Sequence, residues 1–91
     1  YMYFVYVLFS LKDSRLYIGF CSNIESRFAR HQAGYVAATM HRRPLILIYY
    51  EAYQSEPEAK RRERYLKGGN GRAQLKIQLS ETFKNIGYKF L

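Results

Sequence analysis

Cysteine is nearly absent from this chain of 91 residues, in which Cys21 is the only one. A single thiol excludes an intramolecular disulfide and a Cys-rich zinc site. No hydrophobic run reaches the length of a membrane span, and no charged segment precedes the apolar start, so residues 2–11 are expected to form a buried strand rather than a signal sequence. We therefore expect a cytoplasmic protein, associated with the nucleoid if bacterial, that does not enter a membrane.

Acidic residues are also few. The chain has 7 Asp and Glu against 15 Lys and Arg, which gives a formal net charge of +8. Such an excess on a small body favours a polyanionic partner, with nucleic acid ahead of acidic proteins, anionic membranes or a merely basic surface. Repeats, low-complexity tracts and linkers are absent, so residues 1–91 are expected to form a single domain.

Three segments have the composition of β-strands. The continuous aromatic and β-branched run at 2–11 is followed by a "KDS" turn and by "RLYIGF" at 15–20, which predicts a hairpin. A third strand is predicted for "PLILIYYEAY" at 44–53. Gly19 interrupts the second strand, and a glycine inside a strand marks a bulge or a close approach to the backbone.

Helices are predicted between and after these strands. "SNIE" at Ser22–Glu25 is a capping box that opens a helix over 23–33, closed by Gly34. "SEPE" at Ser55–Glu58 opens a second helix that runs to about Lys67 and ends at Gly68–Gly69. Residues 35–43 lack a period and are expected to be a loop.

The C-terminal segment allows two interpretations. "LKIQL" alternates like a strand, yet four apolar residues follow a helical spacing, and we favour a third helix: Leu75, Leu79, Phe83 and Ile86. The predicted order is ββαβαα, an α+β fold with a small three-stranded antiparallel sheet flanked by helices.

Two polar side chains interrupt the apolar face of the first predicted helix. Ile24 and Phe28 define its buried stripe, and His31 occupies the next position on that stripe. Arg27 lies on the flank of the same face, four residues before His31. A boundary histidine and a snorkelling arginine would explain each residue alone.

The second predicted helix places a carboxylate on its inward stripe. Glu63 lies between Ala59 and Leu66, and a carboxylate that faces a core must be paired, neutralised or bound to a metal. A solvated salt-bridge face is the simpler alternative, given the neighbouring "KRRER". Magnesium nevertheless commonly uses one or two carboxylates and takes other ligands from water and substrate phosphate.

The remaining cations of this region are candidates for contacts with phosphate groups, although a solvated surface is the simpler explanation for any one of them. They are Lys60, Arg61, Arg64, Lys67, His41, Arg42 and Arg43.

These residues together resemble the GIY-YIG nucleases over roughly residues 2–67. The second motif of that family stands unaltered as Tyr17-Ile18-Gly19, and the first is represented by Val5-Tyr6-Val7, which keeps only the tyrosine. Arg27 and His31 match the family's Arg-x-x-x-His helix, and Glu63 matches its metal-binding glutamate. The chain is most similar to small stand-alone members and to the N-terminal nuclease domain of the excision-repair incision subunit.

The resemblance implies a DNA endonuclease that hydrolyses phosphodiester bonds with Mg²⁺ or Mn²⁺, in repair or recombination. It assigns Tyr6 as general base, His31 as proton acceptor and Tyr17 as the residue that positions water or phosphate. Arg27 would stabilise the charge that develops on phosphate, and Glu63 would hold the metal. Gly19 would lie against the substrate, and specificity would come from DNA shape, a homodimer or a partner protein.

Other readings stay open from the sequence. The fold could grip nucleic acid without cutting it, or the chain could be a small basic adaptor that binds other proteins. Larger family members also carry a polar residue after the glutamate helix, for which Asn70 and Asn85 are both candidates.

Overall fold

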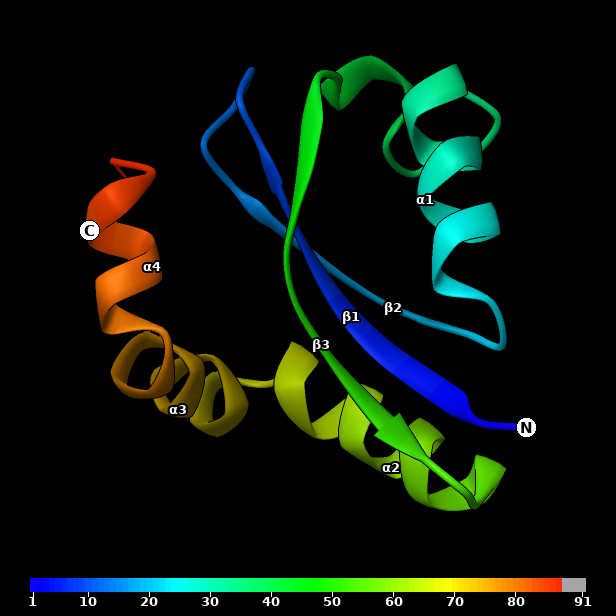
Figure 1. Ribbon diagram of the computed structural model, residues 1–91. Coiled ribbons are helices and arrows are strands. Elements are labelled where there is room, and N and C mark those ends of the chain that lie inside the picture. Colours follow the sequence, from blue (N-terminus) through cyan, green and yellow to red (C-terminus); the bar gives the residue numbers. More distant parts are fainter. Residues whose placement is uncertain (88–91) are drawn as a thin grey trace.

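The computed structural model describes residues 1–87 and contains three strands and four α-helices in the order shown in Figure 1. The elements are β1 Tyr3–Ser10, β2 Leu16–Cys21, α1 Ile24–Ala33, the short 3₁₀ helix η1 Met40–Arg42, β3 Leu45–Tyr53, α2 Glu56–Lys67, α3 Gly69–Gln78 and α4 Ser80–Asn85. The predicted α+β class and the antiparallel three-stranded sheet are confirmed.

The sheet has the order β2-β1-β3, so β1 is its central strand. Both neighbours run antiparallel to it, and Tyr6 pairs with Gly19 on one side and with Tyr50 on the other. A register shift between Val7 and Leu8 interrupts the β1–β3 ladder. The central position keeps β1 buried from Val5 to Ser10, as its apolar composition predicts.

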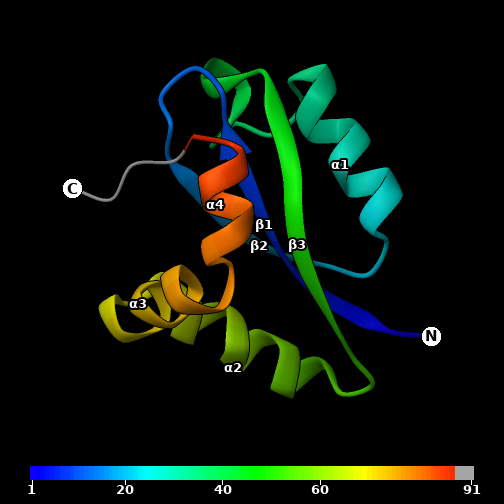
Figure 2. The same cartoon turned by 60° about the vertical axis from the view of Figure 1, so that its left-hand side comes forward.

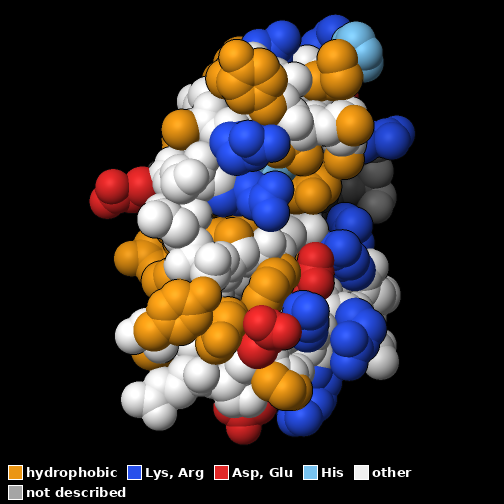
Figure 3. All heavy atoms as spheres, turned by 90° about the vertical axis from the view of Figure 1, so that its right-hand side faces the viewer, with side chains coloured by type: hydrophobic (Ala, Val, Ile, Leu, Met, Phe, Trp, Pro, Cys, Tyr) orange, Lys and Arg blue, Asp and Glu red, His pale blue; other side chains and the backbone are white. Residues whose placement is uncertain are grey.

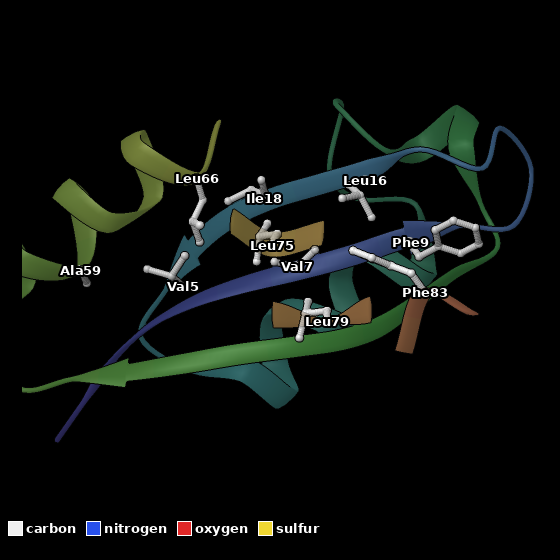
Figure 4. Close-up of a cluster of buried hydrophobic side chains, with 10 residues drawn as sticks. All are labelled: Val5, Val7, Phe9, Leu16, Ile18, Ala59, Leu66, Leu75, Leu79 and Phe83. Carbon is white, nitrogen blue, oxygen red and sulfur yellow. The ribbon is translucent and has the colours of Figure 1, made fainter. Parts of the chain in front are cut away.

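One face of the sheet packs on α2, α3 and α4 (Figure 2). Alternate residues of β1 point to this face, because successive side chains of a strand lie on opposite sides. Figure 4 shows these side chains directed toward those of the helices. The buried cluster consists of Val5, Val7, Phe9, Leu16, Ile18, Ala59, Leu66, Leu75, Leu79 and Phe83.

The other face is covered by α1 and the segment that follows it (Figure 2). Its buried residues are Tyr6, Leu8, Cys21 and Leu45, against which Ile24 and Phe28 of α1 pack. The predicted inward stripe of this helix is therefore present. It places α1 directly over Tyr6.

The helix ends agree with the sequence except at one position. Gly34 adopts the left-handed conformation, with φ 86°, and closes α1 as predicted, and Ser55 caps α2 by accepting a hydrogen bond from the Glu58 amide. The predicted cap at Ser22 is wrong: the side chain of Asn23 accepts from the Ser26 amide at 2.9 Å. Asparagine caps as well as serine, so α1 begins one residue later.

The C-terminal helix is broken in two. The predicted helical spacing is present, since Leu75, Leu79 and Phe83 are all buried in the same cluster. However, α3 ends at Gln78 and α4 begins at Ser80, with Leu79 in a non-helical conformation between them. This break lets the chain turn along the sheet, so the order is ββαβααα rather than ββαβαα. Within residues 1–87, none of the helices combines the length and apolar character that crossing a bilayer requires.

Candidate active site

A buried chain of hydrogen bonds joins the central strand to α1 and to the loop beyond it. The Tyr6 hydroxyl lies 2.8 Å from Nε2 of His31, and Nδ1 of the same ring lies 2.7 Å from the Thr39 hydroxyl. Tyr6 is 3% exposed, whereas His31 and Thr39 are inaccessible to solvent. Because both ring nitrogens are engaged, the imidazole is fixed in position against the phenol.

Burial controls the protonation of this pair. Desolvation lowers the pKa of His31 to about 4, with a smaller contribution from the neighbouring Arg27, so the imidazole is neutral at pH 7. Desolvation is also the main cause that raises the pKa of Tyr6 above its usual value of 10.0. In the free protein the proton therefore resides on the phenol, and the imidazole is uncharged.

Arg27 and Glu63 approach this pair from different elements. The Arg27 guanidinium lowers the pKa of Tyr6, whereas the Glu63 carboxylate raises it, so both charges act on the same hydroxyl. Arg27 projects from α1 on one side of the sheet, and Glu63 from α2 on the other. The structure thus brings together residues that lie far apart in the sequence.

Tyr17 completes the group on β2. Its ring centroid lies 5.1 Å from that of His31 and 6.3 Å from that of Tyr6. Tyr17 is more accessible than Tyr6, since it is partly exposed at the surface of the cluster. Tyr6, Tyr17 and His31 are therefore neighbours in space, while Arg27 and Glu63 act on Tyr6 through their charges.

Gly19 lies beneath the Tyr6 ring. A Cβ atom at this position would lie 2.4 Å from both Cζ and the hydroxyl oxygen of Tyr6, which is far closer than van der Waals contact allows. The two residues are also register partners on β1 and β2. The bare backbone of Gly19 therefore leaves room for the Tyr6 phenol, and contact between Gly19 and nucleic acid stays a prediction.

Glu63 has the properties of a ligand for a hard cation. Its side chain is 20% exposed and pairs with Lys67 at 3.0 Å, a contact between helix neighbours that a stronger cation can displace. Residues 1–87 contain no cluster of three or more acidic, histidine or cysteine side chains that could enclose a metal. A single carboxylate fits magnesium, which keeps several waters and accepts phosphate oxygens.

The cations suggested for phosphate binding differ in their surroundings. Arg42 is held by Asp13 at 2.6 Å and by the Leu16 carbonyl, and Arg43 donates to the carbonyls of Met40 and Gln32. These contacts fix η1 and the loop around it, so both arginines have structural roles.

On α2, Lys60 pairs with Glu56 and Lys67 with Glu63, while Arg61 and Arg64 have no ion pair within the described chain. Figure 3 shows Lys and Arg side chains over the middle and the lower right of the surface that faces its viewer, with carboxylates among them. His41 is exposed beyond α1. Binding of phosphate by any of these residues stays a prediction.

Thr39 was missed by the sequence-based reasoning. It lies in the segment at 35–43, whose small and basic residues show no period, so no local pattern marks it. Its importance follows only from the return of the loop to the His31 ring. Asn70 lies in the first turn of α3 and Asn85 ends α4, and both are exposed.

Comparison with known proteins identifies the family and relatives of this chain. A family model described as the GIY-YIG catalytic domain matches residues 2–76. A UPF0213 protein of Staphylococcus haemolyticus is 41% identical over 76 residues, which cover 82% of this chain and 92% of that protein. A UPF0213 protein of Clostridium perfringens is 35% identical over 89 residues, with 97% and 95% covered.

A solved structure has the same fold. The solution NMR structure of a UPF0213 protein from Bacillus halodurans is 30% identical and superposes with a TM-score of 0.53, over 87% of this chain and 85% of that one. The GIY-YIG family is a nuclease superfamily whose members generally use divalent metals. By its sequence match and its fold, this chain belongs to the GIY-YIG family and is similar to the UPF0213 proteins.

Proposed function

We propose that this protein is a metal-dependent endonuclease that hydrolyses phosphodiester bonds in DNA. The observation that carries the proposal is the buried contact of 2.8 Å between the Tyr6 hydroxyl and a neutral His31, with Arg27 and Glu63 beside it. A phenol held against an uncharged imidazole is a route for removing a proton from water. A guanidinium and a carboxylate whose charges both act on the Tyr6 hydroxyl suit a phosphate and a cation.

Tyr6 and His31 would act as a proton relay. When the Nδ1–H of His31 donates to Thr39, Nε2 is free to accept the proton of Tyr6. As the water oxygen attacks phosphorus, its proton passes to the phenol oxygen while the phenolic proton passes to His31. The relay avoids a free phenolate, which the burial of Tyr6 disfavours.

Arg27 and Tyr17 would bind the reacting phosphate. Attack builds negative charge on the non-bridging oxygens, and a guanidinium stabilises that charge through paired hydrogen bonds. Arg27 lies one helical turn before His31 on α1, and its charge lowers the pKa of both Tyr6 and His31. The partly exposed Tyr17 would position the water or the phosphate from the open side.

Glu63 would hold Mg²⁺ or Mn²⁺ together with water and the substrate phosphate. Such an ion, when bound, polarises the phosphate and stabilises the leaving oxygen. Binding would also release Lys67 from Glu63, which frees one more cation for the DNA backbone.

The test is a cleavage screen on single-stranded, duplex, flapped and branched DNA, with and without Mg²⁺ or Mn²⁺. We expect cleavage that depends on metal and falls as the pH approaches the His31 pKa of about 4, since only a neutral imidazole can accept the phenolic proton. The Glu63→Gln variant controls for a contaminating nuclease. DNA that is bound in the presence of Mg²⁺ but never nicked would contradict the proposal and indicate a binding module instead.

The setting we propose is DNA repair or recombination, which rests on the family, in the cytoplasm, which rests on the single cysteine of the sequence. Selectivity would come from DNA shape, from a second copy of the chain or from a partner protein. The cleavage screen tests selectivity by DNA shape directly. If the protein alone strongly prefers one DNA structure, no partner protein is needed to explain its selectivity.

A further inference from the structure

A polar groove runs along α1 beside the candidate active site. It is lined by Cys21, Ser22, Asn23, Ser26, Arg27 and Arg30. Arg27 belongs both to this groove and to the group around Tyr6, so the two sites are continuous. We propose that Ser26 and Arg30 bind the phosphate that neighbours the scissile phosphate in the same DNA strand.

The geometry of α1 places the side chains of Ser26, Arg27 and Arg30 next to one another on the helix surface. Residues three and four apart in a helix are surface neighbours, with Cβ atoms roughly 5–6 Å apart. Arg30 is therefore adjacent to both Arg27 and Ser26 on the surface of α1. A strand whose scissile phosphate meets Arg27 would present its next phosphate to Arg30.

Arg30 is charged and has no acidic partner within residues 1–87. Its guanidinium lies over the Tyr35 ring, 5.9 Å from the ring centroid. Stacking on an aromatic face orients the group but leaves its N–H donors at the edge unused. Arg42 differs in this respect, because Asp13 already neutralises it.

The other lining groups also suit a phosphate. The Ser26 hydroxyl has no hydrogen-bond partner in the described chain, and a serine hydroxyl can donate to a phosphate oxygen. No aromatic ring lines the groove, so it offers no surface on which a base could stack. The groove is therefore suited to the backbone of DNA rather than to its bases.

This proposal rests on the proposed nuclease function and assigns different roles to two arginines of α1. Arg27 acts on the reacting phosphate and affects turnover. Arg30 acts on a phosphate that does not react, so it affects binding.

The experiment measures DNA binding in a Glu63→Gln background without metal, by fluorescence anisotropy at several salt concentrations. Arg30→Gln is compared with Lys84→Gln, which removes the same charge from the exposed surface of α4 on the opposite side of the sheet. We expect Arg30→Gln to raise Kd roughly three- to tenfold at low salt. It should also reduce the salt slope by about 0.7 to 0.9. Lys84→Gln should change neither.

A second measurement uses DNA with one neutral methylphosphonate at a linkage next to the cleavage site. The substitution should weaken binding of the parent but not of Arg30→Gln, because the contact it removes is already lost. Two results would contradict binding of the neighbouring phosphate by Arg30. One is a methylphosphonate that weakens DNA binding equally in the parent and in Arg30→Gln, at both linkages that flank the cleavage site. The other is an Arg30→Gln variant with the same Kd and salt slope as Lys84→Gln. If the protein with Glu63 intact binds DNA in the presence of Mg²⁺ and never cuts it, the nuclease function would be overturned instead, while the comparison of Kd values would still test the phosphate site at Arg30.

Discussion

The two faces of β1 belong to different kinds of interior. Val5, Val7 and Phe9 point into a cluster of buried apolar side chains from the sheet and from α2–α4, against which Tyr49 and Tyr53 pack with their hydroxyls donating to Glu51. Tyr6 and the alternate residues point toward α1, where the buried polar side chains of the described chain also lie. These are His31, Thr39 and Ser10, whose hydroxyl donates to the Arg42 carbonyl.

The two faces of β1 therefore differ in what they contribute: the α2–α4 face contributes mainly to stability, and the α1 face holds the residues proposed for catalysis. Apolar burial stabilises by about 25 cal/mol for each Å² removed from water, so the α2–α4 side supplies most of the favourable energy. Buried polar groups cost free energy unless each finds a partner, and on the α1 side each buried polar atom has one. One strand therefore carries the larger apolar core on one face and the buried polar groups of the candidate site on the other.

The largest expected effect comes from breaking the apolar side. Phe83→Ala removes a fully buried ring and should lower the free energy of unfolding by about 3–5 kcal/mol. Ile77→Ala is the matched control, since Ile77 is 80% exposed on α3 and its loss should cost less than about 0.5 kcal/mol. Urea unfolding followed by circular dichroism measures both. Similar values for the two variants would contradict the assignment of the core.

Charge removal at the α1 side and at α2 should act on cleavage instead. Arg27→Gln and Glu63→Gln should each lower kcat by at least about a hundredfold, because each removes a group that acts on the developing charge. Neither should lower the free energy of unfolding by more than about 1 kcal/mol, since both side chains are partly exposed. Glu58→Gln, an exposed change on the same helix as Glu63, should leave cleavage unchanged. Parental activity in either site variant would refute these roles.

The two histidines allow a sharper comparison. His31 has a pKa of about 4 in the folded state against 6.5 when exposed, so the unfolded chain binds a proton in this range that the folded chain does not. Stability is therefore fully present above pH 6.5 and falls as pH falls, by about 2 kcal/mol between pH 7 and pH 5.

Substitution should separate His31 from other titrating groups. His31→Asn should remove this pH dependence, whereas His41→Asn should preserve it because His41 is exposed. Thermal or urea unfolding at a series of pH values gives the slope for each variant. A slope that survives in His31→Asn would show that another group causes it.

Much of the fold could be predicted because its signals are local. Alternation and β-branched composition marked the strands, and Gly34 and Ser55 marked helix ends through short-range hydrogen bonds. The spacing of Arg27 and His31 also lies within one helix. The Asn23 cap was missed because two adjacent residues can cap equally well, and the backbone angle decides between them.

Features that depend on tertiary contacts could not be predicted. Thr39 matters only because its loop returns to His31. Counting charges could not distinguish Arg42, which Asp13 holds, from Arg30, which has no acidic partner in the described chain. A sequence records the presence of a charge, whereas its availability depends on neighbours that are distant along the chain.

The smallest substitution, a single methyl group added at Gly19, tests the boundary between the two kinds of interior. Gly19→Ala would place a methyl group 2.4 Å from the Tyr6 hydroxyl oxygen, so the phenol must move away from His31. We expect the free energy of unfolding to fall by about 1–3 kcal/mol. The rate of cleavage by the folded protein should fall as well, because the relay depends on the contact between Tyr6 and His31. Gly69→Ala is the control, because a Cβ there meets no atom within 4 Å and alanine favours the first turn of α3. If Gly19→Ala cleaved DNA at the parental rate, the Tyr6–His31 contact would have no part in the reaction, even though the fold around it would stand.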